Sequence, residues 1–309
     1  MNDKKIISLL PAATEIVSAL GLAENLVGIS HECDYPENIK NLPVCTSSNI
    51  DSEATSHQID TAVKAVLSKA LSVYNLDTSL IRELDPDVII TQSQCRVCAV
   101  SLADVESELA DILDKKVKVI SLEPQTLDDI LNDIRHVAAE FQLAEQAEIL
   151  IEELEERVNI IKHKLKFIET KPSVACIEWL SPIMLAGNWT PGLVNIAGGE
   201  AILVEEGKHS PFIDFEKISS ENPDIVIVMP CGFSIERTLR EINLLLDLPE
   251  WQELNAVKNN RIYIADGNQY FNRPGPRIVD SIEILAEIIH PKQFVFGYEG
   301  EGWIRFNVN

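Results

Sequence analysis

Short apolar segments alternate with helical patterns along most of this chain, and each segment is bounded by Pro, Gly, Asp or Ser. This alternation is typical of βα units that build a mostly parallel sheet. The strands predicted in the first half are Ile6–Leu10, Leu26–Ile29, Val88–Thr91 and Val117–Ser121. Those predicted in the second half are Ser173–Glu178, Ile225–Met229 and Ile262–Ala265.

One long helix is predicted between the two sets of strands, from about Ala144 to Ile168. Its apolar residues recur at intervals of three and four, which places them on one face of a helix. They are Ala147, Leu150, Leu154, Val158, Ile161, Leu165 and Ile168. A helix of about 25 residues spans roughly 40 Å at about 1.5 Å per residue, so it is long enough to run along two lobes as a brace.

A weak internal repeat supports a two-lobed α/β chain. The segment Leu80–Ile90 resembles Lys217–Ile227, because both read as a short helix, a Pro-Asp pair and a buried strand. The two segments fall at the same stage of each half. We therefore predict an N-terminal lobe over residues 1–142, a connecting helix over 143–170 and a C-terminal lobe over 171–309. Each lobe is expected to be a mostly parallel sheet flanked by helices.

The charge of the chain restricts its partners. With 49 acidic and 26 basic residues, its formal net charge is −23. This argues against nucleic acid or an anionic membrane surface as a partner, because their phosphates would be repelled. No apolar stretch approaches the roughly 20 residues that a membrane-spanning helix needs, so an integral membrane protein is not expected.

The first residues bear on where the protein works. Lys4 and Lys5 precede the short apolar run Ile6–Leu10, which Pro11 interrupts. The segment therefore reads as a strand turning into a helix rather than as a secretion signal. Six cysteines in a chain of this size do not suggest a disulfide-dense secreted protein. We expect a cytoplasmic protein, or a periplasmic one if the native chain starts further upstream.

Ligands of open α/β sheets bind outside the carboxyl ends of the strands. The loops predicted there hold an unusual share of the chain's Cys, His, Trp and Arg residues. In the first half they span residues 11–15, 30–36, 92–100 and 123–126. In the second half they span residues 179–191, 230–233 and 266–276, with 207–212 as a further candidate. Polar and soft side chains are thus predicted to gather in one zone.

Five segments near these loops carry a family resemblance. They are Ile7-Ser8-Leu9-Leu10-Pro11-Ala12-Ala13-Thr14-Glu15, Gly28-Ile29-Ser30-His31-Glu32-Cys33-Asp34-Tyr35-Pro36, Leu84-Asp85-Pro86-Asp87-Val88-Ile89, Ala197-Gly198-Gly199 and Asn272-Arg273-Pro274-Gly275-Pro276-Arg277. In order and spacing they resemble the periplasmic-binding family for vitamin B12 and iron chelates, over about residues 5–290. The resemblance implies a clamshell of two α/β lobes joined by one long rigid helix, the helical-backbone class of ABC transporter substrate-binding proteins.

The resemblance also implies a ligand and a partner. The ligand would be a cobalamin-like corrinoid, such as vitamin B12, or an iron chelate in the cleft between the lobes. The partner would be an ABC-type permease, which docks on one acidic residue of each lobe. Glu216 fits this position in the second lobe, seven residues before Pro223. The corresponding residue of the first lobe, seven before Pro86, is Ser79.

Aromatic, imidazole and guanidinium groups are the candidate ligand contacts. Aromatic faces suit a flat macrocycle because they give a large contact area at low entropic cost. Imidazole can ligate cobalt or iron, although a loop histidine equally serves as a hydrogen-bonding group. The candidates are the aromatic residues Trp179, Trp189 and Tyr270, the histidines His31 and His209, and Arg273. Each aromatic residue also fits half-buried packing.

The sharpest local motif is Cys95-Arg96-Val97-Cys98, in a loop after a predicted strand. Such a pair fits metal ligation by thiolate, a redox couple or a direct contact with the ligand. Because a zinc site normally needs four ligands, the others would have to come from His31, Cys33 and Cys231 on other loops. The thiols equally fit packing as weak hydrophobes.

These thiols support a second hypothesis, a cytoplasmic metal- or metallocluster-binding protein. It would hold iron, zinc or cobalt and have a chelatase-like or redox role. No catalytic residue is predicted, because the chain has no Gly-x-Ser-x-Gly, no phosphate-cradling glycine-rich loop and no His-Glu-x-x-His. Together with the resemblance, this favours a binding protein over an enzyme.

Overall fold

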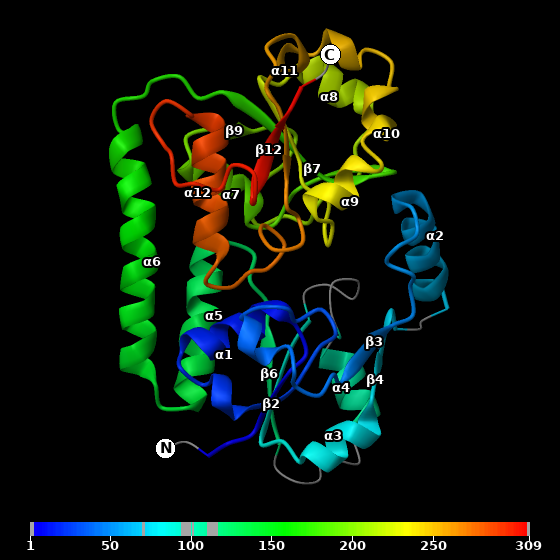
Figure 1. The fold of residues 1–309 in the computed structure, drawn as a ribbon, viewed down its shortest axis with the longest axis vertical. Coiled ribbons are helices and arrows are strands. Elements are labelled where there is room, and N and C mark those ends of the chain that lie inside the picture. The colour runs from blue at the N-terminus through cyan, green and yellow to red at the C-terminus, as the bar shows by residue number, and fades with distance from the viewer. Residues whose placement is uncertain (1–2, 70–71, 94–99, 101, 110–116, 308–309) are drawn as a thin grey trace. The chain divides into compact units, whose positions relative to one another are not determined.

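The computed structural model describes residues 3–69, 72–93, 100, 102–109 and 117–307. Their contacts divide the chain into two compact units. Unit 1 comprises residues 1–54, 58–124 and 128–152, and unit 2 comprises residues 55–57, 125–127 and 153–309. The division falls inside one continuous helix, α6 (Ala144–Leu165) (Figure 1). The lobe boundaries predicted from the sequence, at 142/143 and 170/171, stay a prediction.

Unit 1 contains a four-stranded parallel sheet in the order β2-β1-β5-β6. Its strands are β1 (Ile6–Ser8), β2 (Leu26–Ile29), β5 (Val88–Gln92) and β6 (Lys118–Leu122). A separate antiparallel pair consists of β3 (Thr46–Ser48) and β4 (Tyr74–Leu76). β1 and β5 are buried along their whole length, as expected for strands covered by helices on both faces.

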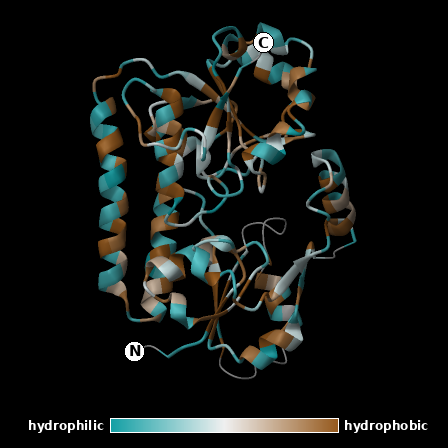
Figure 2. Cartoon of the chain, viewed as in Figure 1, coloured by the Kyte–Doolittle hydropathy of each residue, from teal (hydrophilic) through white to brown (hydrophobic). Residues whose placement is uncertain are grey.

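The helices that follow these strands carry the rest of the unit 1 core. Pro11 opens α1, where its missing N–H costs nothing, and Ala12–Val17 behind it are buried. The apolar residues are concentrated on the strands and on the inner faces of the helices (Figure 2). The helical elements up to α6 are α1 (Pro11–Ala19), η1 (Ala23–Asn25), η2 (Glu37–Ile39), α2 (Ser56–Leu67), α3 (Thr78–Leu84), α4 (Leu102–Glu108) and α5 (Leu127–Glu140).

Unit 2 contains a six-stranded mixed sheet in the order β12-β11-β10-β7-β8, with β9 also paired to β7. β7, β10 and β11 are parallel, and β12 and β8 are antiparallel additions. The strands are β7 (Ser173–Leu180), β8 (Ile183–Leu185), β9 (Glu200–Ala201), β10 (Ile225–Val228), β11 (Ile262–Ala265) and β12 (Trp303–Phe306). β10 and β11 are fully buried.

The unit 2 helices surround this sheet. They are α7 (Thr190–Ile196), α8 (Phe215–Glu221), α9 (Ile235–Leu239), α10 (Asn243–Leu246), η3 (Trp251–Glu253), α11 (Asn255–Lys258) and α12 (Ile278–Ile289). α12 is buried on nearly every side and carries acids that must find partners. Arg157 of α6 pairs with Glu283 and Asp280 at 2.6 Å each. Burial alone would lower the pKa of the guanidinium, but the two carboxylates outweigh it and raise the pKa.

A second buried acid of α12 holds the segment that leads to β12. Glu287 is 4% exposed, and its carboxylate accepts hydrogen bonds from the backbone N–H groups of Phe296, Gly297 and Tyr298. It also accepts one from Trp303 Nε1, at 2.8 Å. Four donors compensate the cost of burying one charge, so this loop is tied firmly to α12.

The predicted fold class is confirmed: each unit is an α/β structure with a parallel sheet at its centre, and every predicted strand is present. The predicted bounds differ in places for local reasons. β1 ends at Ser8 rather than Leu10, because Leu10 is the N-cap of α1. β7 extends to Leu180, since its last residues pair with β8. The long helix ends at Leu165, three residues before the predicted end.

The internal repeat is a structural repeat as well. In unit 1, α3 ends at Asp85, which has the left-handed φ of 51°, and Pro86-Asp87 then lead into β5. In unit 2, α8 ends at Asn222 with a φ of 49°, and Pro223-Asp224 lead into β10. Asp and Asn tolerate this conformation better than other non-glycine residues, which explains why they end these two helices.

The aspartate of each Pro-Asp pair makes the same bond. Asp87 Oδ2 accepts a hydrogen bond from Lys5 N at 2.8 Å, at the entry to β1. Asp224 Oδ2 accepts hydrogen bonds from Ser173 N at 2.9 Å and Ser173 Oγ at 3.0 Å, at the entry to β7. Each carboxylate therefore aligns the start of the first strand of its unit with the central strand beside it.

Replacing Asp224 by alanine should lower the free energy of unfolding by about 1–3 kcal/mol, because two donors of Ser173 lose a partly buried acceptor. Asp87→Ala should cost less, since Asp87 is exposed and water can replace it. Urea denaturation of both variants measures the difference. A larger loss for Asp87→Ala would contradict this account.

Candidate functional site

In the main sheet of each unit, the strand order reverses at one point, so that the connections on its two sides lead to opposite edges of the sheet. In unit 1 it lies between β1 and β5, and in unit 2 between β7 and β10. Ligands of open α/β sheets bind at the carboxyl ends of the strands beside such points. The loops that leave β1, β2, β7, β10 and β11 are therefore the candidate site of each unit.

His31 lies in the loop after β2 and is held by one hydroxyl group. Its backbone N–H donates to Thr46 Oγ1 at 3.0 Å, and its Nδ1 lies 2.7 Å from the same oxygen. Its ring centroid lies 5.5 Å from that of Tyr74. Thr46 belongs to β3, so the pairing of β3 with β4 positions both neighbours of the imidazole.

The hydrogen bonds select one tautomer of His31. Thr46 Oγ1 uses its only proton to donate to Ser30 Oγ at 3.1 Å, so toward His31 it acts as an acceptor. Nδ1 therefore carries the proton, and Nε2 carries a lone pair. Burial lowers the pKa of His31 below its ordinary value of 6.5, which keeps the ring neutral at pH 7. Among the described residues, the nearest acid to Nε2 is Glu32, whose Oε1 lies 4.0 Å away. A neutral imidazole whose Nε2 carries a lone pair is what a metal centre requires of a histidine ligand.

Cys33 lies two residues further along the same loop but has a different environment. It is 7% exposed, and its sulfur lies within hydrogen-bonding distance of Thr14 Oγ1, at 3.1 Å. Thr14 Oγ1 also lies 2.8 Å from Ser8 Oγ, at the end of β1. This thiol is thus part of the packing between α1 and its loop, and its burial favours the packing alternative over ligation.

A cavity of about 410 Å³ adjoins the support of His31. It is lined by Val44, Thr46, Ser47, Asn75, Leu76, Asp77 and Thr78. Asp77 is the N-cap of α3 and accepts hydrogen bonds from Ser79 Oγ and the N–H of Leu80, which lower its pKa. A carboxylate in the ionised state therefore lies at the edge of this cavity.

Aromatic side chains gather at the carboxyl ends of β7 and β10 in unit 2. The rings of Trp179 and Phe233 lie 5.2 Å apart in a tilted arrangement. The guanidinium of Arg237 lies 4.3 Å from the centroid of Phe233 and pairs with Glu241 at 2.5 Å. Trp179 Nε1 donates to the carbonyl oxygen of Ser56, so its N–H is already bonded.

Backbone bonds join β7 to the loops that follow β10 and β11. Cys231 N donates to Glu178 O at 3.0 Å, and Gly267 N donates to Phe233 O at 2.9 Å. Gly267 is required here, because a Cβ at this position would collide with the carbonyl oxygen of Pro230. Glu178 also accepts a hydrogen bond from Ser210 Oγ at 2.5 Å. The end of β7 and the loops after β10 and β11 are therefore connected by hydrogen bonds.

The other predicted ligand contacts of unit 2 differ in accessibility. Trp189 is 7% exposed, and its Nε1 donates to Phe271 O at 2.7 Å, so it fits the packing alternative. Arg273 is 6% exposed and donates to Asn268 Oδ1 at 3.3 Å. Tyr270 is half-buried, with Arg277 5.7 Å from its ring. His209 is exposed, and Cys231 is half-buried.

The thiol cluster of the second hypothesis finds no support in the described part of the chain. Cys95 and Cys98 lie outside the described residues. Within residues 3–69, 72–93, 100, 102–109 and 117–307, no group of three or more His, Cys, Asp and Glu side chains could hold a metal ion. Cys33 is buried beside Thr14, at 3.1 Å from its hydroxyl.

Sequence reasoning missed three groups of this site. Thr46 selects the tautomer of His31, Phe233 forms the aromatic pair with Trp179, and Arg237 covers that pair. Phe233 had a signal, since Pro230-Cys231-Gly232-Phe233 directly follows a predicted strand. Thr46 had none, because its partner is 15 residues away along the chain.

Comparison with known proteins places these observations in a family. The family described as periplasmic binding protein matches residues 6–268. An uncharacterized ABC transporter substrate-binding lipoprotein of Bacillus subtilis, YvrC, is 23% identical over 95% of this chain and 82% of its own length. A vitamin B12-binding protein of Vibrio parahaemolyticus is 22% identical over 92% of this chain and 88% of its own length. A solved periplasmic heme-binding protein of Pseudomonas aeruginosa has a TM-score of 0.69 at 18% identity, covering 94% of each chain.

The predicted cytoplasmic location is wrong. The matched family is a periplasmic one, and YvrC is a lipoprotein. The prediction rested on the reading of Ile6–Leu10 as a strand, and Ile6–Ser8 is indeed β1. A strand at this position says nothing about the compartment, which explains the error. None of the described helices is both long enough and apolar enough to span a bilayer.

His31 should titrate below pH 6.5, because burial lowers its pKa. Its ring should therefore be neutral at pH 7 and gain a proton only in more acidic solution. NMR titration of the imidazole resonances, assigned by their absence in His31→Gln, tests this. The urea-unfolded chain provides the control, in which the same ring should return to its ordinary value. A folded-state pKa at or above 6.5 would contradict the geometry.

Proposed function

We propose that this chain, which belongs to the periplasmic binding protein family, is the substrate-binding component of an ABC-type importer. It works outside the cytoplasm and delivers a small molecule to a permease. The relatives that it matches include an ABC transporter substrate-binding lipoprotein. We further propose that the chain binds its ligand without transforming it, as the matched family is one of binding proteins.

The proposed ligand is a corrinoid or an iron chelate, and in particular a flat macrocycle with a metal at its centre. The observation that carries this choice is His31, whose Nε2 is left with a lone pair by the bond between Nδ1 and Thr46. Imidazole nitrogen suits both cobalt and iron. The names of relatives and neighbours support the class, since they include vitamin B12-binding and heme-binding proteins.

Trp179 is proposed as a second contact, through the face of its ring. It is half-buried beside Phe233, and aromatic faces suit a macrocycle. Tyr270, His209, Cys231 and Arg273 stay predicted contacts from the same group of loops. Trp189 is the weakest of the predicted set, because its ring is buried and its N–H is bonded to backbone.

Titration with hemin and with aquocobalamin, whose upper cobalt position carries exchangeable water, tests the ligand class. At least one should bind saturably and shift its absorption spectrum as Nε2 enters the metal coordination sphere. His31→Ala should abolish the shift and weaken binding by about tenfold or more, or about 1.4 kcal/mol. The matched control is His136→Ala, which removes an exposed imidazole on α5.

Each result of this titration decides a separate point. A spectral shift with hemin alone selects the iron chelate, and one with aquocobalamin alone selects the corrinoid. Saturable binding that His31→Ala leaves unchanged would remove His31 from the site while preserving the carrier function. Binding of neither compound would overturn the proposed ligand class.

Glu216 is proposed as a docking residue for the permease. It is exposed in the first turn of α8, and the repeat places α3 at the same stage of unit 1. There Ser79 stands in the corresponding position, and its hydroxyl donates to the N-cap residue Asp77 at 2.6 Å. Asp77 therefore supplies a negative charge at the start of α3, although the residue that corresponds to Glu216 there is the uncharged Ser79.

Glu216→Lys should lower uptake of the ligand by cells that carry the importer, because it reverses the charge that faces the permease. Ligand affinity of the purified protein should stay unchanged. The matched control is Glu253→Lys, which reverses an exposed acid elsewhere in unit 2. Equal loss of uptake in both variants would mean that overall charge, rather than docking at α8, determines transport.

A further inference from the structure

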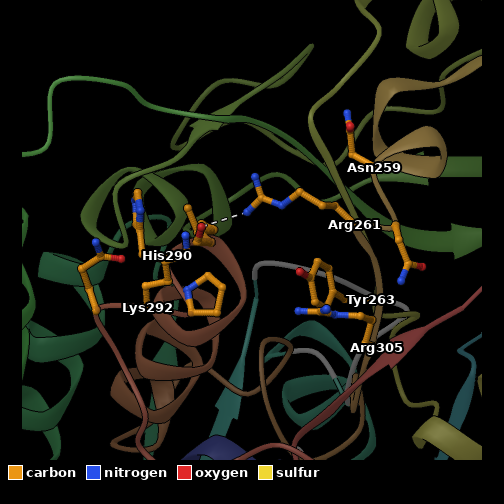
Figure 3. Close-up of a pocket in the computed structure, with 10 residues that line it drawn as sticks. Asn259, Arg261, Tyr263, His290, Lys292 and Arg305 are labelled. Atoms are coloured by element: carbon orange, nitrogen blue, oxygen red, sulfur yellow. Dashed lines mark hydrogen bonds between the residues drawn. The ribbon is translucent and has the colours of Figure 1, made fainter.

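A cavity of about 340 Å³ lies in unit 2 between the entry to β11 and the end of α12 (Figure 3). Its charged and amide side chains are Arg261, Lys292, Arg305, Asn259, Asn260 and Gln293. None of its ten lining residues is an aspartate or a glutamate. This is unexpected in a chain with 49 acidic and 26 basic residues, because most surface cavities of such a chain should be lined by some carboxylates.

The three cations of the cavity have no acidic partner among the described residues. Lys292 is exposed and makes no ion pair there. Arg305 is exposed, and its guanidinium lies 5.6 Å from the ring of Tyr263. Four other cations of unit 2, Arg157, Arg237, Arg240 and Lys258, do pair with acids. The positive charge of this cavity is therefore uncompensated within the described chain.

Two of these cations are held in place by the fold. Arg261 Nη2 donates to Ile289 O at 2.9 Å, at the carboxyl end of α12, and this bond is the dashed line in Figure 3. It covers a carbonyl oxygen that would otherwise repel an anion. Arg305 is positioned by the pairing of β12 with β11, in which it lies opposite Tyr263. Donors fixed in advance bind an anion with little loss of side-chain entropy.

The cavity lies away from the candidate ligand site. Arg261 precedes β11, at the amino end of a parallel strand, whereas Gly267 and the ligand loops follow its carboxyl end. A ligand at the cavity would thus be separate from the transported molecule, and the two could bind at the same time.

We propose that this cavity binds a phosphate group. A guanidinium presents planar paired donors that match phosphate oxygens, and a lysine adds a mobile positive charge. Two sources share this chemistry, namely free inorganic phosphate and the headgroup of an anionic phospholipid. The proposal does not depend on which molecule the importer carries.

The surroundings of the cavity make the phospholipid source worth a separate experimental arm. Val295 is 87% exposed, three residues after Lys292, on the loop that Glu287 ties down. Lys164 of α6 lies 5.3 Å from the ring of Phe294, next to Val295, and Phe167 beyond it is 83% exposed. Exposed apolar residues among lysines are typical of surfaces that enter a lipid headgroup layer.

The net charge of −23 does not exclude this binding. At physiological ionic strength, charges more than about 8 Å from a phosphate are largely screened. The cations that line the cavity therefore act on the phosphate more strongly than distant carboxylates do. The affinity should fall as the salt concentration rises.

Calorimetric titration of the full chain with inorganic phosphate, against sodium chloride at equal ionic strength, forms the first arm. The second arm is flotation with phosphatidylcholine vesicles that contain or lack phosphatidylglycerol. Binding in the first arm alone assigns free phosphate, and anionic-vesicle binding alone assigns the headgroup. Binding in both arms assigns the shared phosphate chemistry.

The test variant is Lys292→Glu with Arg305→Glu, which should reduce binding by about tenfold or more, because two attractive charges become repulsive. The control is Lys69→Glu with Lys118→Glu, two exposed lysines of unit 1, which changes net charge equally. Lys292→Arg with Arg305→Lys conserves both charges and should retain binding, which shows that the loss in the glutamate variant is not caused by misfolding. No binding in either arm, or equal loss in both glutamate pairs, would overturn the proposal.

Discussion

The parallel pairing of the first strand of each unit with the central strand beside it is the constraint on which the rest depends. Asp87 in unit 1 and Asp224 in unit 2 follow a helix that ends in the left-handed conformation, then a proline. Their carboxylates accept the N–H of Lys5 and of Ser173. Each bond adds to the backbone pairing at the start of the first strand, where parallel strands have no short turn to align them. The loops at the carboxyl ends then follow from that register.

Register decides which loops meet, and their chemistry decides what they can bind. In unit 1 the end of β2 brings His31 to Thr46, so that a single hydroxyl determines which ring nitrogen is free. Cys33, two residues away, is instead enclosed by α1. In unit 2 the parallel order of β7 and β10 brings Trp179 to Phe233. An imidazole in unit 1 and an aromatic pair in unit 2 are therefore the groups that each fold presents at these loops, in keeping with the proposed metal-centred macrocycle.

Charge acts at two scales in this protein. The acidic excess opposes general attraction to nucleic acids and anionic surfaces, and this conclusion depends only on composition. The cavity around Arg261, Lys292 and Arg305 has the opposite sign, because the fold gathers cations from three places and no carboxylate. Because salt screens distant charges, the net charge of the chain does not predict which ions a single pocket attracts.

The sequence by itself determined the α/β class, the strands, the long helix and the repeat, because each depends on local periodicity and on residues such as Pro86-Asp87 that act on their neighbours. It also carried the family resemblance, since that is a matter of order and spacing. Tertiary structure decided the tautomer of His31, the burial of Trp189 and the basic cavity. These features depend on residues that are distant in the sequence: His31 and Thr46 are 15 positions apart, and Trp189 and Phe271 are 82 positions apart. Periodicity reports which face of an element is buried, but it does not report which distant side chain lies against it.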